Sequence, residues 1–208
     1  MFDAHYEEWR EKRIKTILDY YTPEFFKDKT LLELGAGYCD IGAEFAKLGS
    51  IVTCVEGRQE HLEVARERYP DLNIVFKQLD LDKETLLNSY DVVLHMGLLY
   101  HLRHSESSIR NICQIGKYIV LESEILDSSS PHISIPVRED GYDQALNGWG
   151  CRPTRKFVEY KLTECGVKFE MLQSDSANSG MHKYDWQELD NGKWEDGQRR
   201  MWFINKIT

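Results

Sequence analysis

A glycine-rich turn stands between two short apolar segments of this chain. Residues 30–34 are mostly apolar, and Gly35-Ala36-Gly37 follows them directly. Glycine lets the backbone come close to a ligand, and the free amides at the start of a following helix favour a charged group. Glu56 ends the next apolar segment, about 20 residues further on, where a carboxylate can accept both hydroxyls of a ribose. The spacing therefore indicates a nucleoside-binding site.

The turn differs from that of dinucleotide-binding proteins. Their third glycine would stand at position 40, which is Asp40 here, and Glu33 adds a second carboxylate just before the turn. Two carboxylates repel a pyrophosphate but suit a ligand that carries an amino group and a positive charge. The residues therefore favour a cationic nucleoside over NAD.

Histidines and carboxylates that follow two later apolar segments could act as a general base. His95 ends residues 91–95, His101 lies in the turn after it, and Glu122 and Glu124 follow residues 117–121. Removal of a proton from a hydroxyl group near neutral pH is a usual task of histidine. We expect the base among these four residues, in the order His101, His95, Glu122 and Glu124.

The elements that must position these residues alternate regularly. Strands are expected at 30–34, 51–55, 73–76, 91–95, 117–121, 167–172 and 200–207, and helices at 6–21, 40–47, 59–69, 105–113 and 154–165. Asp40 is the expected N-cap of the second helix. Short strands separated by helices predict an α/β fold of three layers around a mainly parallel sheet.

Residues 126–153 have a different texture, rich in Ser, Pro and Gly, and predict a long irregular segment. Because it follows the fifth strand, we expect it to lie over the ligand cleft as a lid. Its aromatic, amide and charged side chains suit a polyhydroxylated acceptor such as a sugar. The expected acceptor-binding residues are Tyr100, Asp143, Asn147, Trp149 and Arg152.

The motifs resemble those of class I S-adenosylmethionine-dependent methyltransferases. The resemblance rests on residues 33–37, 55–56, 78–81 and 90–102, in that order along the chain. It implies one Rossmann-like domain over 1–208, with a seven-stranded sheet, an antiparallel C-terminal strand and an N-terminal helix (1–22) over the cofactor cleft. One departure is Cys39, which stands where the family usually has a third glycine.

The resemblance also implies roles for individual residues. Glu33 would organise the turn or meet the methionine amino group, Glu56 would hold the ribose, and Asp80 the adenine amine. The backbone of Leu81 would meet the adenine edge, while His95 and Met96 would line the methionine side. The implied cofactor-binding set is Glu33, Gly35, Gly37, Glu56, Asp80, Leu81, His95 and Met96.

The resulting prediction is methyl transfer from S-adenosylmethionine to an oxygen of a sugar or another small polar acceptor. A methyltransferase acting on tRNA or protein is the alternative. A nicotinamide-dependent oxidoreductase and a non-catalytic binding protein of the same fold stay open as further classes.

The amino-acid composition reduces the number of classes of binding partner that this protein could have. Against 35 acidic side chains stand 26 Lys and Arg, and this net charge of −9 makes nucleic acid an unlikely partner. No apolar stretch is long enough for a membrane span, and the N-terminus lacks a signal-peptide pattern. The five cysteines suggest neither a disulfide framework nor a zinc site, Cys54 is expected in the core, and a reducing cytoplasm fits best. No metal site is predicted.

Overall fold

The computed structural model describes residues 6–194 and 197–206. Residues 1–5 of the expected N-terminal helix lie outside the described part. The helices are α1 (Glu7–Tyr21), α2 (Asp40–Lys47), α3 (Gln59–Arg68), α4 (Ser105–Ile115) and α5 (Arg155–Glu164), with short 3₁₀ turns η1 (Pro23–Phe26), η2 (Leu99–His101) and η3 (Asp175–Ala177). The strands are β1 (Thr30–Leu34), β2 (Ile51–Glu56), β3 (Ile74–Gln78), β4 (Tyr90–Met96), β5 (Gly116–Glu124), β6 (Ser134–Arg138), β7 (Trp149–Pro153), β8 (Lys168–Leu172) and β9 (Arg199–Asn205).

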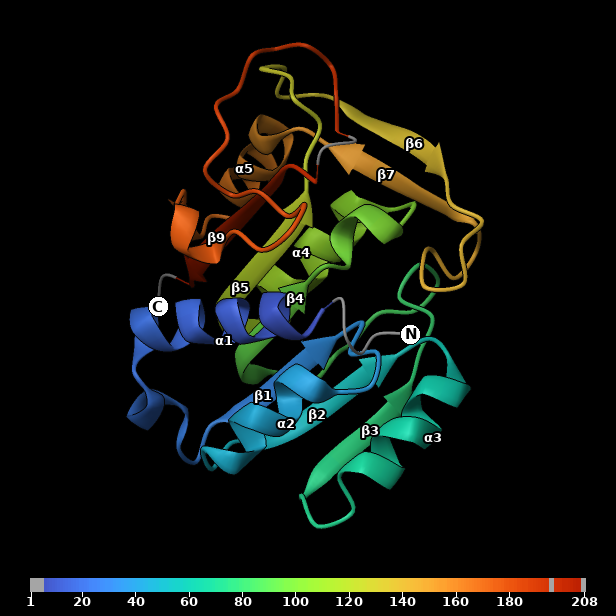
Figure 1. Ribbon diagram of the computed structural model, residues 1–208, viewed down its shortest axis with the longest axis vertical. Coiled ribbons are helices and arrows are strands. Elements are labelled where there is room, and N and C mark those ends of the chain that lie inside the picture. The colour runs from blue at the N-terminus through green and yellow to red at the C-terminus, as the bar shows by residue number, and fades with distance from the viewer. Residues whose placement is uncertain (1–5, 195–196, 207–208) are drawn as a thin grey trace.

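Seven strands form one sheet in the order β3-β2-β1-β4-β5-β9-β8 (Figure 1). Strands β1 to β5 pair in parallel, whereas β9 runs antiparallel to both of its neighbours. The predicted mainly parallel seven-stranded sheet with an antiparallel C-terminal strand is confirmed. Such a sheet needs apolar cover on both faces, which explains why its central strands are almost entirely apolar.

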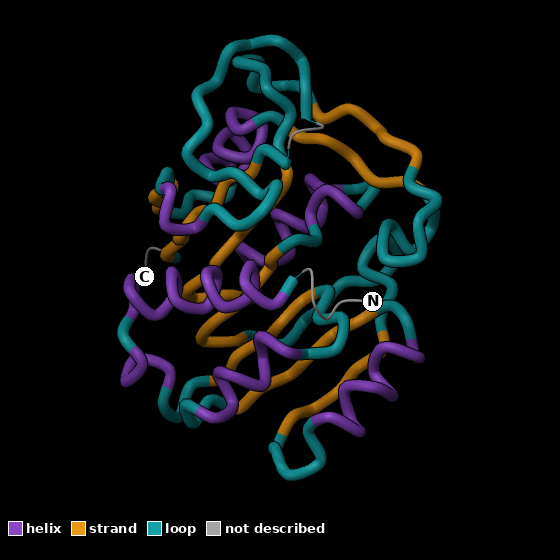
Figure 2. The backbone as a smooth tube through the Cα atoms, viewed as in Figure 1, coloured by secondary structure: helices purple, strands orange, loops and turns teal. Residues whose placement is uncertain are grey.

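Two separate apolar clusters give the three layers. Side chains of α1, α2 and α3 pack on one face of the sheet, around Ile17, Phe45 and Leu94. Side chains of α4 and α5 pack on the other face, around Ile112, Val158 and Leu121. Figure 2 shows the resulting arrangement, with helices on both sides of the strands.

The sequence predicted an irregular segment at 126–153, but the structure contains regular strands there. It contains β6 and β7, which pair antiparallel in a small second sheet, with residues 139–148 connecting them. The sequence did not predict these strands because it has Pro136 and Gly150 in them, and proline and glycine are uncommon inside strands. Gly150 is required there for space, since a Cβ at this position would lie 2.3 Å from the Tyr100 carbonyl oxygen.

No helix within the described ranges is long and apolar enough to cross a membrane.

Candidate functional site

A cavity lies at the carboxyl ends of β1, β2, β3 and β4. Its walls are the segments that follow these four strands, together with α1 and part of the connection between β6 and β7. Ligands of open α/β sheets bind at this edge, where neighbouring strands lead to helices on opposite faces. The cavity is therefore in the place that the alternation of elements predicts.

The glycine turn has the backbone that its sequence suggests. Gly35 and Gly37 have φ angles of 64° and 54°, which favour glycine, and both line the cavity. A Cβ on Gly35 would lie 2.9 Å from the Leu98 side chain. Cys39, at the third position of the motif, also has a positive φ of 61° and is the N-cap of α2. The prediction that Asp40 is the N-cap is therefore wrong; Asp40 is the first helical residue and pairs with Arg10.

Glu56 is buried at the end of β2, and its carboxylate is held in place by three groups. It accepts hydrogen bonds from the backbone N–H of Gly37 (2.9 Å) and Arg58 (3.0 Å), and His61 Nδ1 lies 3.5 Å away. Burial opposes ionisation, but these partners outweigh it, so the pKa of Glu56 is lowered. The cavity is thus lined by the ionised carboxylate of Glu56, a hydrogen-bond acceptor whose orientation is fixed by these three groups.

Asp80 and Leu81 line the same cavity after β3. The Asp80 carboxylate accepts a hydrogen bond from Asn147 Nδ2 at 3.2 Å and pairs with Lys83 at 2.7 Å. These contacts lower the pKa of Asp80 although burial opposes them. Strand register places the ends of β2 and β3 side by side, with Glu56 paired to Gln78, so two acidic side chains meet at one end of the cavity.

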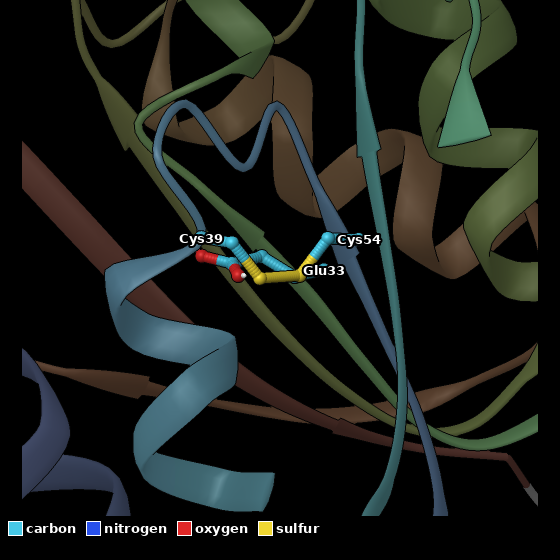
Figure 3. A group of neighbouring side chains, drawn as sticks. All are labelled: Glu33, Cys39 and Cys54. Carbon is cyan, nitrogen blue, oxygen red and sulfur yellow. Dashed lines mark hydrogen bonds between the residues drawn. A yellow bond between two sulfur atoms is a disulfide. The ribbon is translucent and has the colours of Figure 1, made fainter. Parts of the chain in front are cut away.

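Glu33 lies behind the glycine turn, beside Cys54 in the sheet register (Figure 3). It accepts a hydrogen bond from the Gly42 amide at 2.8 Å and also lines the cavity. Complete burial raises its pKa to about 8. A buried acid that is mostly neutral at pH 7 becomes an anion readily when a cationic group arrives beside it.

Cys39 and Cys54 form a disulfide between the turn and β2. Sequence analysis found no disulfide framework and missed this single bond, because α/β topology brings positions 39 and 54 together although no spacing rule predicts it. Glu33 and these two sulfurs are one group of potential metal ligands in the described part of the chain. Zinc binds thiolates, so the sulfurs are not available to a metal while they are bonded to each other.

His101 lies in η2 and lines the same cavity. Its Nδ1 is 2.5 Å from Oε2 of Glu139, a carboxylate that sequence analysis missed. Glu139 is buried, and although burial opposes ionisation, hydrogen bonds from His101 and Arg152 lower its pKa. Because the carboxylate accepts, we assign the ring proton to Nδ1, which leaves Nε2 able to accept a proton.

His95 is not in the cavity, which corrects two predicted roles for it. Consecutive strand residues point to opposite faces of a sheet, so only one of His95 and Met96 could line this site. Met96 does line it, whereas His95 is fully buried against α4, with Nε2 2.8 Å from Ser108 Oγ. Burial lowers the pKa of His95 to about 4.

Glu122 and Glu124 are also absent from the cavity lining, and their partners explain why. Glu122 is fully buried and pairs with Arg13 (3.1 Å) and Arg199 (2.9 Å). Burial alone would raise its pKa, but the two guanidinium groups lower it. Glu124 pairs with Arg152 at 2.6 Å. Carboxylates paired with arginine in this way are poor general bases, so the geometry does not support the predicted role of either residue.

The predicted acceptor-binding residues divide into two groups. Tyr100 and Asp143 line the cavity. Trp149 is 38% exposed outside it, and Arg152 is a buried ion-pair partner of Glu124 and Glu139. Asn147 is not in the cavity lining and donates to the Asp80 carboxylate.

Several cavity residues went unpredicted because nothing in their local pattern marks them. Gln144 and Leu146 come from the 139–148 connection, and Arg13 comes from α1 beside the inward-facing Trp9. Gly97 carried a signal, a glycine directly after a strand, and has a positive φ of 68°. Glu139 lies 38 residues from its partner His101 and only the fold could reveal it.

Known proteins are similar to this chain in sequence and in fold. Residues 32–116 match the family model described as a methyltransferase domain. Over 99% of this chain, the structure is similar to the N-terminal domain of EvdMO1, solved in the presence of SAH and D-fucose, with a TM-score of 0.72, 18% identity and 85% of that chain covered. An S-adenosylmethionine-dependent methyltransferase from Mesorhizobium loti is similar over 92% of this chain and 96% of its own, with a TM-score of 0.68 and 16% identity. Residues 32–116 therefore match a methyltransferase domain, and the chain has the Rossmann-like fold of these solved S-adenosylmethionine-dependent methyltransferases.

The names of two sequence relatives are more specific than the description of the family model. A tRNA U34 carboxymethyltransferase from Tolumonas auensis is 26% identical over 92% of this chain and 61% of its own length. The protein of the same name from Proteus mirabilis is 30% identical over 50% of this chain and 33% of its own length. The chain thus spans less than two thirds of either relative. The tRNA in these names runs against the expectation, drawn from net charge, that nucleic acid is an unlikely acceptor.

Proposed function

We propose that this protein transfers the methyl group of S-adenosylmethionine to a hydroxyl oxygen of a sugar or a similar small polar acceptor. We further propose that residues 1–208 act as one methyltransferase domain. The observation that carries the reaction type is the contact between His101, which lines the cavity, and the buried carboxylate of Glu139.

Other residues of the cavity fit the cofactor. Gly35 and Gly37 bring the backbone to the cavity wall without a side chain, and Glu56 provides a fixed acceptor for ribose hydroxyls. Glu33 suits the amino group, since its burial is compensated once a cation lies beside it. Arg13 Nε is buried without a hydrogen-bond partner among the described residues and suits the carboxylate of the methionine moiety. The cofactor supplies an activated methyl group on a sulfonium.

The protein's own residues then have two tasks, alignment and proton removal. Trp9, Met96 and Tyr100 line the cavity with His101 and restrict the position of an acceptor. His101 Nε2 takes the proton of the attacking hydroxyl, and the Glu139 carboxylate stabilises the imidazolium that forms. A general base of this kind contributes ~10²–10⁴-fold in rate.

A sugar acceptor is supported by one observation. The similar N-terminal domain of EvdMO1 was solved in the presence of SAH and D-fucose.

Methylation of tRNA is the second candidate, and the names of the two sequence relatives favour it. The net charge of −9 counts against it, because tRNA binding rests on phosphate neutralisation by Lys and Arg.

The test is transfer of label from S-[methyl-³H]adenosylmethionine to D-fucose and other free sugars, nucleotide sugars, small phenols, tRNA and protein. We expect label in a sugar fraction. The variant His101→Ala should lower turnover ~10²–10⁴-fold and leave SAH affinity, measured by calorimetry, close to that of the wild type.

His104→Ala is the matched control, since His104 is exposed and outside the cavity, and it should react like the wild type. Label in tRNA and none in any sugar would replace the first candidate by the second. Binding of NAD in place of SAH would refute the methyltransferase proposal itself.

A further inference from the structure

The connection between β6 and β7, residues 139–148, covers the end of the cavity that holds Glu56 and Asp80. Arg58 Nη2 donates to the Gln144 carbonyl at 2.8 Å, and Asn147 binds the Asp80 carboxylate. The side chain of Leu146 reaches so close to Gly57 that a Cβ there would lie 2.7 Å from it. The connection thus covers the nucleoside end, although sequence analysis expected an acceptor lid.

The same connection is attached at its start to His101. Oε2 of Glu139 contacts His101 Nδ1 and also accepts a hydrogen bond from the backbone N–H of Ala145 at 3.1 Å. The other oxygen, Oε1, accepts from Arg152 Nη1 at 2.8 Å. The Glu139 N–H donates to the Gly148 carbonyl at 3.0 Å, which closes the connection into a loop. One buried carboxylate therefore holds both the imidazole and the segment over the nucleoside end.

We propose that Glu139 is a positioning residue that couples closure of residues 139–148 over the cofactor to the orientation of His101 for proton removal. The inference rests on the proposed function, since it assigns the base to His101. The coupling has a physical basis in the shared acceptor. When Asn147 and Leu146 pack against a bound nucleoside end, Ala145 is fixed, and its N–H then fixes the oxygen that His101 uses.

Binding and chemistry are coupled in both directions under this proposal, because coupling between two sites is reciprocal. A change at the Asp80 end alters the reaction step even when the cofactor is saturating. A change at Glu139 alters cofactor affinity although Glu139 is not in the cavity lining.

Three variants test the coupling: Glu139→Gln, Asn147→Ala and the two combined. Glu139→Gln should lower kcat ~10–100-fold, the usual effect of removing the partner that orients a histidine, and weaken SAH binding roughly 5-fold or more. Asn147→Ala should weaken SAH binding and also lower kcat at saturating S-adenosylmethionine. The combined variant should lose less than the product of the single effects, because both changes break one link.

A spectroscopic measurement reports on the imidazole directly. In ¹⁵N-labelled wild-type protein, SAH should shift the ring-nitrogen signals of His101, and in Glu139→Gln this response should be lost. Asp140→Asn is the matched control, because Asp140 is exposed and pairs only with Arg138 among the described residues, and it should behave like the wild type.

Asn147→Ala with unchanged kcat at saturating cofactor and an unchanged His101 response to SAH would overturn the coupling. Asn147 is exposed, so this variant keeps the test valid if Glu139→Gln does not fold. The SAH measurements need no acceptor, so an error in the proposed acceptor leaves them interpretable. A His101→Ala variant with full turnover would instead refute the proposed base.

Discussion

At the scale of single residues, three buried acids of similar sequence context have different charges. Glu56 is ionised because amide donors and His61 compensate its burial, and Glu122 because two arginines do so. Glu33 has one amide donor, and the positive charge of Arg13 only partly offsets its complete burial, so its pKa rises to about 8. The sequence shows an acid at or near the end of each of these strands. It does not show the charge of each acid, because the partners that set this charge come from distant segments.

The state of Glu33 makes the stability of the protein depend on pH. Its pKa rises from an ordinary value of 4.5 to about 8 on folding, so the folded state holds a proton that the unfolded state releases between these values. The free energy of unfolding should therefore fall as pH rises through this window, by up to ~1.4 kcal/mol per pH unit. Glu33→Gln should remove this dependence.

Urea unfolding of both proteins at pH 5.5 and 7.5 measures the difference. We expect the wild type to lose ~1–3 kcal/mol relative to Glu33→Gln between these two pH values. Glu24→Gln, at an exposed position, should follow the wild type. A wild type and a Glu33→Gln variant with parallel pH profiles would contradict the raised pKa.

At the scale of elements, periodicity predicted the five helices and the seven strands of the main sheet within a few residues. Those elements carry their own signal, since each buries a regular apolar face. The pair β6–β7 carries none, because its stability comes from pairing with each other and from close contact of Gly150 with the Tyr100 carbonyl. The Cys39–Cys54 bond was equally hidden, as it depends on how the turn returns to β2.

This disulfide should stabilise the fold and the turn together. It closes a 15-residue separation, and loops of this length contribute about 3 kcal/mol, with a usual range of ~2–4 kcal/mol. We expect dithiothreitol to lower the free energy of unfolding of the wild type by that amount and to have little effect on Cys54→Ala. Equal unfolding curves of the wild type with and without reductant would show that the bond does not form in solution.

At the scale of the whole molecule, sequence analysis placed the cavity correctly but not all of its chemistry. Cavity residues such as Gly35, Glu56 and Asp80 follow successive strands, and parallel strands end at one edge, so their position around one cavity was predictable. Contacts between segments that are distant in the sequence were not predictable. His101 finds Glu139 in the segment beyond β6, and the three carboxylates Glu122, Glu124 and Glu139 find arginines from α1, β7 and β9.

Glu122 of β5 links α1 and β9 through two ion pairs, so its loss should lower the stability of the whole fold. Its oxygens accept from Arg13 of α1, from Arg199 of β9 and from the Tyr184 hydroxyl at 3.2 Å, and Tyr184 in turn accepts from Trp9 Nε1 at 2.9 Å. Removing one partner of a buried ion pair leaves uncompensated charges in the interior and costs ~3–5 kcal/mol. We expect Glu122→Ala to lose that much free energy of unfolding in urea, whereas His101→Ala, at a partly exposed side chain, should lose far less. A Glu122→Ala protein that is as stable as the wild type but has lost turnover would show instead that Glu122 acts in the reaction.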